Sequence, residues 1–481
     1  MAKKHFIFFT LILLALRFLH FGPDLEAPHD WRQCDTAHYS RDFYENGLDL
    51  LHPKVCWMGN RDTLALEFPL PEAIVALGYQ ITGESIPWAR MCFFLFFGLS
   101  VYYLYQFTGL LWGTGMAKIS SIIFMGAPLS LFYSRAIHID FFVVFCTHAM
   151  VHYFLCGLKN KRTEAIILSS FFAALAFLVK AAYPFYWIIP LLYYVHHLRQ
   201  WRWFLSRSFI FMLPLLLFFW WQHRVFTINN ASPDWSYILH YHKMIQSPGW
   251  YFGHFKFRLQ PYPWFILFLR GTGEAAGFAG SILLIFGLIR SKSIPQAGFL
   301  WSWLTGIGLY ILVFFNLNVV HNYYQIPLVA PAAVLIGWGI LSAAQNNQIK
   351  ILIMSSAIVL VNFIYAETNY YHVSHDHVEA GQIIQENTPE KALVIVTYGN
   401  LDCRNPKILY RAHRKGWSVE EAALNPTVLT RLHREEKAAY WIYIGQSVPQ
   451  TISDALPGSL ILLKSIPLNS VKKTAFIFKL V

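Results

Sequence analysis

Side chains that could carry out proton transfer gather in one polar segment, residues 28–43, soon after the first long apolar run. The segment contains Asp35 and Tyr39, and Glu67 follows further along, just before a Pro-Leu-Pro step. Carboxylates close to a membrane surface can act as general bases or as metal ligands. The alternative is a solvated loop helix with ordinary charges, and spacing alone favours that alternative.

Cationic side chains that could face an anionic ligand are spread over the later chain, and each also has a structural interpretation. Arg135 could extend to lipid head groups, and Lys180 could anchor a helix at the membrane interface. Arg258 and Arg270 could be solvated loop charges, and His321 an ordinary interfacial histidine.

Other titratable residues are more ambiguous. Asp140 stands just inside an apolar run, where an unpaired charge is costly, so we expect a structural pair with Arg135. The pair in His240-Tyr241-His242 could bind a metal if that segment were a strand, although such pairs are more often solvated. Cys34 and Cys56 share one loop, and a disulfide and two free thiols are equally compatible with that spacing.

The composition indicates a membrane protein. The chain has 481 residues, of which 56% are hydrophobic and only 13% are charged. Soluble domains carry about 25% charged residues. The net charge of +12 does not point to nucleic acid, because many of the Lys and Arg fall in short loops between apolar runs, where membrane topology explains them.

The elements that must position these residues are therefore membrane helices, which need about 20 apolar residues each. We predict about eleven of them, at 6–21, 91–111, 116–133, 138–157, 163–181, 183–197, 206–225, 276–290, 297–315, 321–343 and 349–366. The run at 70–81 is short and contains Pro71 and Glu72, so we expect a re-entrant or interfacial helix there.

The distribution of basic residues predicts the orientation. If the N-terminus with Lys3 and Lys4 is cytoplasmic and 70–81 does not span, most basic residues of the short loops are cytoplasmic as well. Only Arg135 and Lys180 then occupy the short exported turns. The first run is interrupted by Arg17 and lacks a small-residue cleavage site, so we interpret it as a retained helix rather than a signal peptide.

This topology exports the loops 22–90 and 226–275 and everything after the last span. We therefore predict two domains, a transmembrane domain at 1–366 and an exported domain at 367–481. The exported part reads as helix 375–387, strand 392–397, helix 427–436, strand 439–444 and two late strands at 460–466 and 474–480. The predicted fold is a polytopic α-helical membrane protein with a C-terminal α/β soluble domain.

Several motifs, in order, resemble the GT-C superfamily of glycosyltransferases, in particular the branch of protein O-mannosyltransferases and lipid A aminoarabinose transferases. That family has an Asp-Glu-x-x-Tyr motif in the first exported loop and then a Glu shortly before a Pro-Leu step. The matching segments are Asp35-Thr36-Ala37-His38-Tyr39, Glu67-Phe68-Pro69-Leu70, Ser134–Asp140, His321–Pro327 and Leu409–Trp417.

The resemblance implies a donor sugar on a polyprenyl phosphate, inverting transfer to an acceptor hydroxyl, and a bacterial inner membrane with a periplasmic domain. It implies Asp35 as the base that removes the acceptor proton and Glu67 as a positioning or metal-binding group. Arg135, Lys180, Arg258, Arg270 and His321 are the candidates for binding the donor phosphate. Tyr39, His138 and Asp140 would support the acceptor or the loop.

The sequence also departs from the family pattern. Thr36 replaces the usual acid after the first Asp, and Phe68 stands where many members have Lys, which puts a phosphate contact there in doubt. A divalent metal ion is compatible with the resemblance, because some relatives use one and others do not. Lipid A, a glycan chain, a wall polymer and a protein hydroxyl all fit as acceptors, and the transferred group could be a hexosyl or a pentosyl unit.

Three other functions compete. A transporter or flippase of lipid-linked saccharides should show matched, Gly- or Pro-broken helices in two halves, and no such pair is visible. A saccharide ligase or polymerase usually places its large exported loop late, whereas here the acidic loop directly follows the first helix. A non-catalytic envelope scaffold would transfer no sugar, and a variant of Asp35 would test that alternative.

Overall fold

The computed structural model describes residues 2–231, 248–345, 347–454, 456 and 458–481, which form two compact units. The helical unit consists of residues 2–23, 85–223 and 248–371, and the sheet unit of residues 24–84, 224–231 and 372–481. The sheet unit thus contains both most of the first predicted exported loop and the C-terminal part of the chain. The predicted domains 1–366 and 367–481 follow membrane topology instead and stay predictions. The pair His240 and His242 lies outside the described residues.

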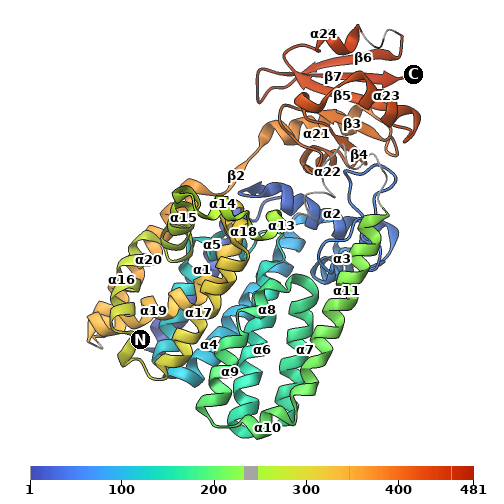
Figure 1. Ribbon diagram of the computed structural model, residues 1–481. Coiled ribbons are helices and arrows are strands. Elements are labelled where there is room, and N and C mark those ends of the chain that lie inside the picture. Colours follow the sequence, from blue (N-terminus) through green and yellow to red (C-terminus); the bar gives the residue numbers. More distant parts are fainter. Residues whose placement is uncertain (1, 232–247, 346, 455, 457) are drawn as a thin grey trace. The chain divides into compact units, whose positions relative to one another are not determined.

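The helical unit is built almost entirely from helices (Figure 1). Its longer helices are α1 (Lys3–Ala15), α4 (Ile86–Gly126), α6 (Asp140–Asn160), α7 (Thr163–Lys180), α9 (Ile188–His197), α11 (Met212–Asn230, which ends in the sheet unit), α16 (Phe278–Ile289), α17 (Ala297–Val313), α19 (Ile326–Ala344) and α20 (Gln348–Asn369). Shorter helices between them are α5 (Pro128–Tyr133), α8 (Ala182–Phe185), α10 (Trp201–Leu205), α13 (Pro248–Phe252), α14 (Phe255–Arg258), α15 (Pro261–Leu269) and α18 (Phe315–Val320).

Six helical segments of the described chain are long and apolar enough to cross a membrane. A seventh candidate is a pair, Pro261–Ala275 and Phe278–Ile289, bent by 99° at the break between them. The protein is therefore a polytopic α-helical membrane protein, as predicted from composition, while the number eleven stays a prediction. Two predicted spans, 91–111 and 116–133, largely merge into α4, which has 41 residues and a non-helical φ of 85° at Gly113. A straight helix of this length would measure roughly 60 Å, twice the hydrocarbon thickness, so the break at Gly113 is consistent with two passes that meet there.

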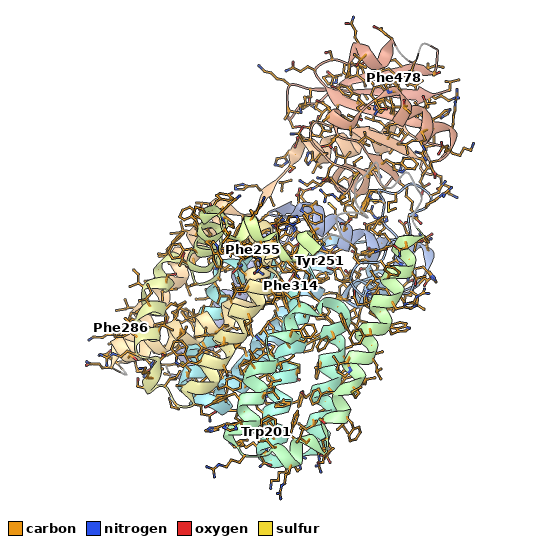
Figure 2. All side chains as sticks on the ribbon, viewed as in Figure 1. Trp201, Tyr251, Phe255, Phe286, Phe314 and Phe478 are labelled. Atoms are coloured by element: carbon orange, nitrogen blue, oxygen red, sulfur yellow. The ribbon has the colours of Figure 1, made fainter. Side chains whose placement is uncertain are left out.

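The outward side chains of the helical unit are those of a protein that faces lipid. Phe255 is 74% exposed and Ile282 is 73% exposed, while Arg90 and Arg135 are fully buried. Figure 2 shows the side chains on the ribbon, including Phe255 and Trp201 on this unit. Soluble proteins usually bury apolar side chains and expose charged ones. The opposite arrangement is expected when hydrocarbon replaces water as the solvent.

Helices α16 and α19 pack at close range through glycines. A Cβ atom at Gly287 would lie 2.0 Å from the carbonyl oxygen of Leu335, and one at Gly339 would lie 2.2 Å from the carbonyl oxygen of Leu283. The two backbones therefore touch where no side chain intervenes. Close approach through small residues is a common way for membrane helices to associate, because burial of apolar side chains gains little in lipid.

The sheet unit contains a five-stranded sheet in the order β4-β3-β5-β7-β6 (Figure 1). Its strands are β3 (Val394–Thr397), β4 (Gly416–Ser418), β5 (Tyr440–Gly445), β6 (Leu460–Pro467) and β7 (Thr474–Leu480). Strand β3 is parallel to β4 and β5, and β7 is antiparallel to β5 and β6. Helices α21 (His375–Asn387), α22 (Lys407–Arg411), α23 (Pro426–Arg434) and α24 (Gln450–Ser453) complete the C-terminal part. The predicted α/β domain is confirmed.

The same unit contains two helices of the first predicted exported loop, α2 (Asp30–Asn46) and α3 (Leu70–Thr82). A short antiparallel pair, β1 (Glu26–Ala27) with β2 (His372–Val373), joins the start of this loop to the start of the C-terminal part. Helix α3 confirms that the apolar run 70–81 is helical, and its proline at the second position is compatible with a first helical turn. Both Cys34 and Cys56 are buried and carry free thiols.

Candidate active site

Helix α2 presents Asp35 as a buried carboxylate. The side chain is 4% exposed, and the indole Nε1 of Trp57 donates a hydrogen bond to its Oδ1 over 3.0 Å. Burial raises the pKa of Asp35 to about 7, while the charge of Arg32 and the Trp57 hydrogen bond act in the opposite direction. A carboxyl group poised near neutral pH can exchange protons with a reacting hydroxyl.

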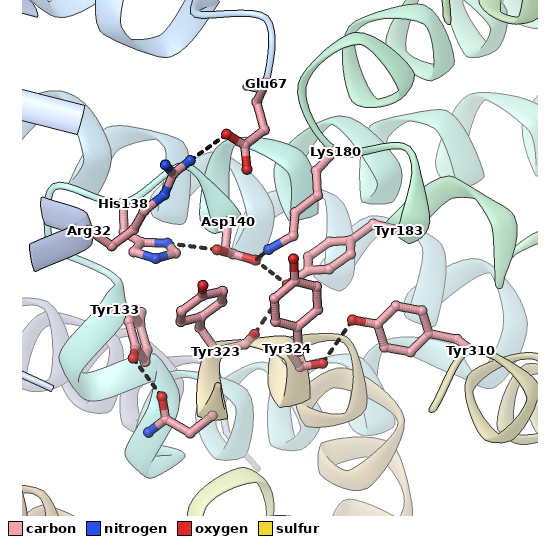
Figure 3. A network of polar contacts seen from close by, with 11 residues as sticks. Arg32, Glu67, Tyr133, His138, Asp140, Lys180, Tyr183, Tyr310, Tyr323 and Tyr324 are labelled. Atoms are coloured by element: carbon pink, nitrogen blue, oxygen red, sulfur yellow. Dashed lines mark hydrogen bonds and ion pairs between the residues drawn. The ribbon is translucent and has the colours of Figure 1, made fainter. Parts of the chain in front are cut away.

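A second carboxylate, Glu67, lies in an ion pair with Arg32 of α2 (Figure 3). The chain just before Glu67 is fixed on two sides. The hydroxyl of Tyr39 donates to the carbonyl oxygen of Leu64 over 3.1 Å, and Asn229 binds both backbone groups of Ala65, at 3.0 and 2.8 Å. The Tyr39 bond thus helps to hold this loop, and the functional role predicted for Tyr39 stays a prediction.

A further buried carboxyl group belongs to Glu72 in the first turn of α3, which is 3% exposed. Burial raises the pKa of Glu72 to about 8, against the effect of its own backbone amide and of Arg32. Its Oε2 has no hydrogen-bond partner within the described part of the chain. Sequence reasoning noted Glu72 only as a reason against a span, because a single acid in an apolar run carries no signal of its environment.

The helical unit contains a second polar cluster, centred on Asp140, the first residue of α6 (Figure 3). The ammonium Nζ of Lys180 lies 2.8 Å from Asp140 Oδ1, and Nδ1 of His138 lies 2.6 Å from Asp140 Oδ2. The hydroxyl of Tyr183 also donates to Asp140. Asp140 is fully buried, so three polar neighbours replace the water that it lacks.

The predicted pair of Asp140 with Arg135 is wrong, because the structure pairs Asp140 with Lys180. Lys180 is the last residue of α7, and the antiparallel packing of α7 on α6 brings that end beside the first residue of α6. Tyrosine rings surround the ammonium group. Its Nζ lies 4.0 Å from the ring centre of Tyr324 and 4.8 Å from those of Tyr183 and Tyr323.

Arg135 and His321 are also buried in the helical unit, each against aromatic rings. The guanidinium carbon of Arg135 lies 4.6 Å from the ring centre of Tyr371. His321 stacks on Tyr323 with a distance of 5.0 Å between ring centres. Cations held against aromatic faces are stabilised by the ring quadrupole. Arg135, Lys180 and His321 are thus buried among aromatic rings, and their role in binding a phosphate stays a prediction.

Arg258 and Arg270 have a different environment. Arg258 donates to the carbonyl oxygen of Phe252 from Nε over 3.1 Å and to that of Val313 over 3.3 Å. Arg270 donates to the carbonyl oxygens of Asn318 over 2.7 Å and Val320 over 3.3 Å. Phe252, Val313 and Val320 are the last residues of α13, α17 and α18. These two arginines therefore satisfy carbonyl groups at helix C-termini, which is a structural task.

Among the described residues, one group of three possible metal ligands is closely spaced, namely Glu45, Glu84 and His413, with ligand atoms within 4.8 Å of one another. None of the site residues predicted from the sequence belongs to it. Arg41 donates from Nε to Glu84 Oε1 over 2.8 Å, and its Nη2 lies 3.3 Å from His413 Nε2. The arginine already neutralises Glu84, so the geometry assigns no metal to this group.

Comparison with solved structures shows that the chain shares the fold of ArnT and AftD. ArnT from Cupriavidus metallidurans in the apo state aligns over 99% of this chain and 98% of its own, with a TM-score of 0.61 and 14% identity. The structure of ArnT bound to undecaprenyl phosphate aligns equally fully, with a TM-score of 0.59 and 13% identity. The arabinofuranosyltransferase AftD from Mycobacteria aligns over 100% of this chain and 40% of its own, with a TM-score of 0.61 and 13% identity.

A family model then gives a closer description. The model for dolichyl-phosphate-mannose-protein mannosyltransferase matches residues 67–222, a stretch that begins at Glu67 and includes the Asp140 and Lys180 cluster. No curated protein matches the sequence. The chain thus resembles the protein mannosyltransferases and ArnT, as the order of its motifs predicted.

Proposed function

We propose that this protein is a membrane glycosyltransferase that moves a hexosyl or pentosyl unit from a polyprenyl phosphate to a hydroxyl group of an envelope acceptor, with inversion at the anomeric carbon. The observation that carries the proposal is the buried carboxylate of Asp35, held by Trp57 at the position of the family's first motif. The choice of donor is supported by the full-length likeness to ArnT, which has been solved with undecaprenyl phosphate bound.

The acceptor oxygen attacks the anomeric carbon on the face opposite the phosphate. A bond forms between them while the bond from the anomeric carbon to the phosphate oxygen breaks, and the polyprenyl phosphate leaves with that electron pair. Positive charge develops on the acceptor oxygen as it attacks, and Asp35 takes the proton from that oxygen. A pKa of about 7 suits this base, because about half of it is ionised at pH 7 and the ionised form is basic enough to accept the proton.

Glu67 and Arg32 act beside the base in this proposal. The charge of Arg32 favours the ionised form of Asp35, and the charge of Glu67 disfavours it. The two charges of the ion pair therefore adjust the basicity of Asp35 in opposite directions, while burial has the larger effect. A Glu67 oxygen is suited to orient the acceptor hydroxyl. Tyr39 keeps the Glu67 loop in place through Leu64.

The leaving phosphate needs positive charge, because negative charge develops on it in the transition state. Lys180 is our first candidate for this role, followed by Arg135 and His321. Asp140, supported by His138, fixes the ammonium group of Lys180 in one position before the donor arrives. Arg258 and Arg270 rank lower, because their guanidinium groups are engaged with helix carbonyls.

The proposed location is the bacterial inner membrane, with the N-terminus in the cytoplasm. Transfer would take place at the periplasmic face, where the predicted topology exports the Asp35 loop and the domain 367–481. The acceptor would then be a glycan, lipid or protein of the cell envelope.

The proposal is tested by measuring sugar transfer in proteoliposomes from labelled polyprenyl-phosphate sugars to envelope extracts. Asp35→Asn is compared with the wild type and with Asp49→Asn, which alters an exposed carboxylate of the same loop. We expect transfer by the wild type and Asp49→Asn and its loss in Asp35→Asn, with undecaprenyl phosphate binding retained. Equal transfer by all three would remove Asp35 from the mechanism and shift the assignment to Glu67. No transfer by the wild type with any donor would contradict the proposed function.

A further inference from the structure

Helix α2 has two polar faces that point in opposite directions. Successive residues of an α-helix are rotated by about 100°. Asp30, Cys34 and Arg41 therefore lie within about 40° of one another around the helix axis. Arg32, Asp35 and Tyr39 fall within about 60° of one another on the opposite side. The second face carries the candidate base, and the first face has no part in the chemistry proposed above.

The first face is covered by α22 and the turn that follows it. Lys407 Nζ lies 2.8 Å from Oδ1 of Asp30, the first residue of α2. Arg411 lies 3.8 Å from the sulfur of Cys34, the neighbour of Asp35. Near the other end of α2, Arg41 donates to the carbonyl oxygen of Tyr410 over 2.8 Å. Contacts with the short helix α22 thus extend along α2 from Asp30 to Arg41, which is about three helical turns.

The segment that carries Trp57 is tied to the same part of the chain. Gly416, the first residue of β4, donates from its backbone nitrogen to the carbonyl oxygen of Cys56 over 2.9 Å. The backbone nitrogen of Gly59 donates in turn to the carbonyl oxygen of Gly416 over 3.0 Å. These bonds bracket Trp57 on both sides. Nearby, Lys415 Nζ lies 2.5 Å from Asp62 Oδ2.

Charge complementarity strengthens this arrangement. Lys407, Arg411 and Lys415 come from the C-terminal part, while Asp30 and Asp62 come from the first loop. Asp30 is 3% exposed, and Lys407 and the backbone amide of Trp31 take the place of water beside its carboxylate. Buried charge pairs of this kind specify one geometry, because an uncompensated partner would be costly.

We propose that α22, its following turn and β4 form a clamp that positions the candidate base Asp35, so that Lys407 and Arg411 are positioning residues for the transfer reaction. The inference rests on the proposed function, since it names what holds that function's base. The clamp acts on Asp35 by two routes, directly through α2 and through Trp57. Catalysis depends on such support, because a misplacement of about 1 Å can lower a rate about 100-fold.

The test uses the full-length protein in nanodiscs with the double variant Lys407→Gln and Arg411→Gln. The matched control replaces Lys391 and Lys472, two exposed lysines of the same C-terminal part. Amide hydrogen exchange is followed in α2, in residues 54–63 and in strands β3 and β5. Sugar transfer is measured over a range of pH.

We expect exchange in α2 and 54–63 to rise about 10-fold or more in the double variant, while β3 and β5 keep their protection. The turnover number should fall about 10-fold to 100-fold with little change in KM for the donor. The acid limb of the pH profile should move to lower pH, because a loosened Asp35 becomes better solvated. Lys407→Arg alone and the Lys391 and Lys472 control should keep both protection and turnover.

Two results would overturn the clamp. One is unchanged exchange in α2 together with unchanged turnover. The other is an equal rise of exchange in α2, β3 and β5, because Lys407 and Arg411 would then hold the C-terminal fold itself. Failure of the proposed function looks different, since the wild type would transfer no sugar with any donor while exchange in α2 still responded to the double variant.

Discussion

The indole nitrogen of Trp57 donates a hydrogen bond to the carboxylate of Asp35 over 3.0 Å, although the two residues are 22 positions apart in the chain. The bond stabilises the ionised carboxylate, whereas burial of Asp35 destabilises it. The balance leaves the pKa of Asp35 at about 7. A carboxyl group that would be fully ionised in water is thereby kept within reach of a proton at neutral pH.

Removal of the Trp57 bond should move the pH dependence of transfer. In Trp57→Phe the carboxylate loses a donor, so the pKa of Asp35 should rise by roughly one unit. A general base works when deprotonated, and the acid limb of the rate profile, expected near pH 7 in the wild type, should therefore shift to higher pH. The rate at pH 7 should fall and largely recover at pH 9. An unchanged limb would show that Asp35 does not set the profile.

The stability of the protein should report the same carboxyl group without any assay of transfer. The folded-state pKa of Asp35 lies above the ordinary value of 3.8, so between about pH 4 and pH 7 the folded state binds the proton more tightly than the unfolded state. The contribution of Asp35 to stability is thus present at low pH and is lost as pH rises through 7. From pH 5 to pH 8 the free energy of unfolding of the wild type should therefore fall relative to that of Asp35→Asn, by up to a few kcal/mol. Thermal unfolding at both pH values measures this difference, and parallel curves would contradict the raised pKa.

Much of the fold follows from local patterns. Helix α21 occupies 375–387 as predicted, because its apolar residues recur with helical spacing and its ends are polar. Strands β5, β6 and β7 were predicted within a residue or two at each end, since long apolar runs between turn residues specify strands. Strand β4 was not predicted. It has three residues, Gly416–Ser418, and exists because β3 supplies its hydrogen-bond partners.

Two carboxylates of the candidate site were predicted from motifs, whereas their partners from distant parts of the chain were not predicted. Asp35 and Glu67 were identified by their motifs, whereas no local signal connects Trp57 to Asp35. The partner of Asp140 was assigned to Arg135 by proximity in the chain. Helices α6 and α7 are of similar length and are joined by a turn at 161–162, so they form an antiparallel hairpin. The last residue of α7, Lys180, must then lie opposite the first residue of α6, Asp140, and counting residues outward from the turn would have identified this pair.

Two glycines of the helical unit should respond differently to an added methyl group, because one lies at the close approach of α16 and α19 and the other does not. Gly287→Ala places a methyl group 2.0 Å from the carbonyl oxygen of Leu335, so the helices must separate. Gly308 in α17 has open space around the same position. Gly287→Ala should destabilise the protein by about 1–3 kcal/mol, whereas Gly308→Ala should be neutral or stabilising by up to about 1 kcal/mol. Thermal unfolding in detergent compares the two, and equal midpoints would contradict the close packing.

The pair of Asp140 and Lys180 can be tested for both stability and ligand binding. Asp140→Asn leaves a buried ammonium group without its carboxylate and should destabilise the protein by about 3–5 kcal/mol. The double variant Asp140→Asn with Lys180→Met removes both charges and should be closer to the wild type, since the two changes are coupled. If Lys180 also binds the donor phosphate, the double variant should bind undecaprenyl phosphate at least about 10-fold more weakly than the wild type, a loss of about 1.4 kcal/mol, even though its stability is largely restored. A purely structural pair would instead let affinity recover together with stability, so the double variant separates the two roles of Lys180.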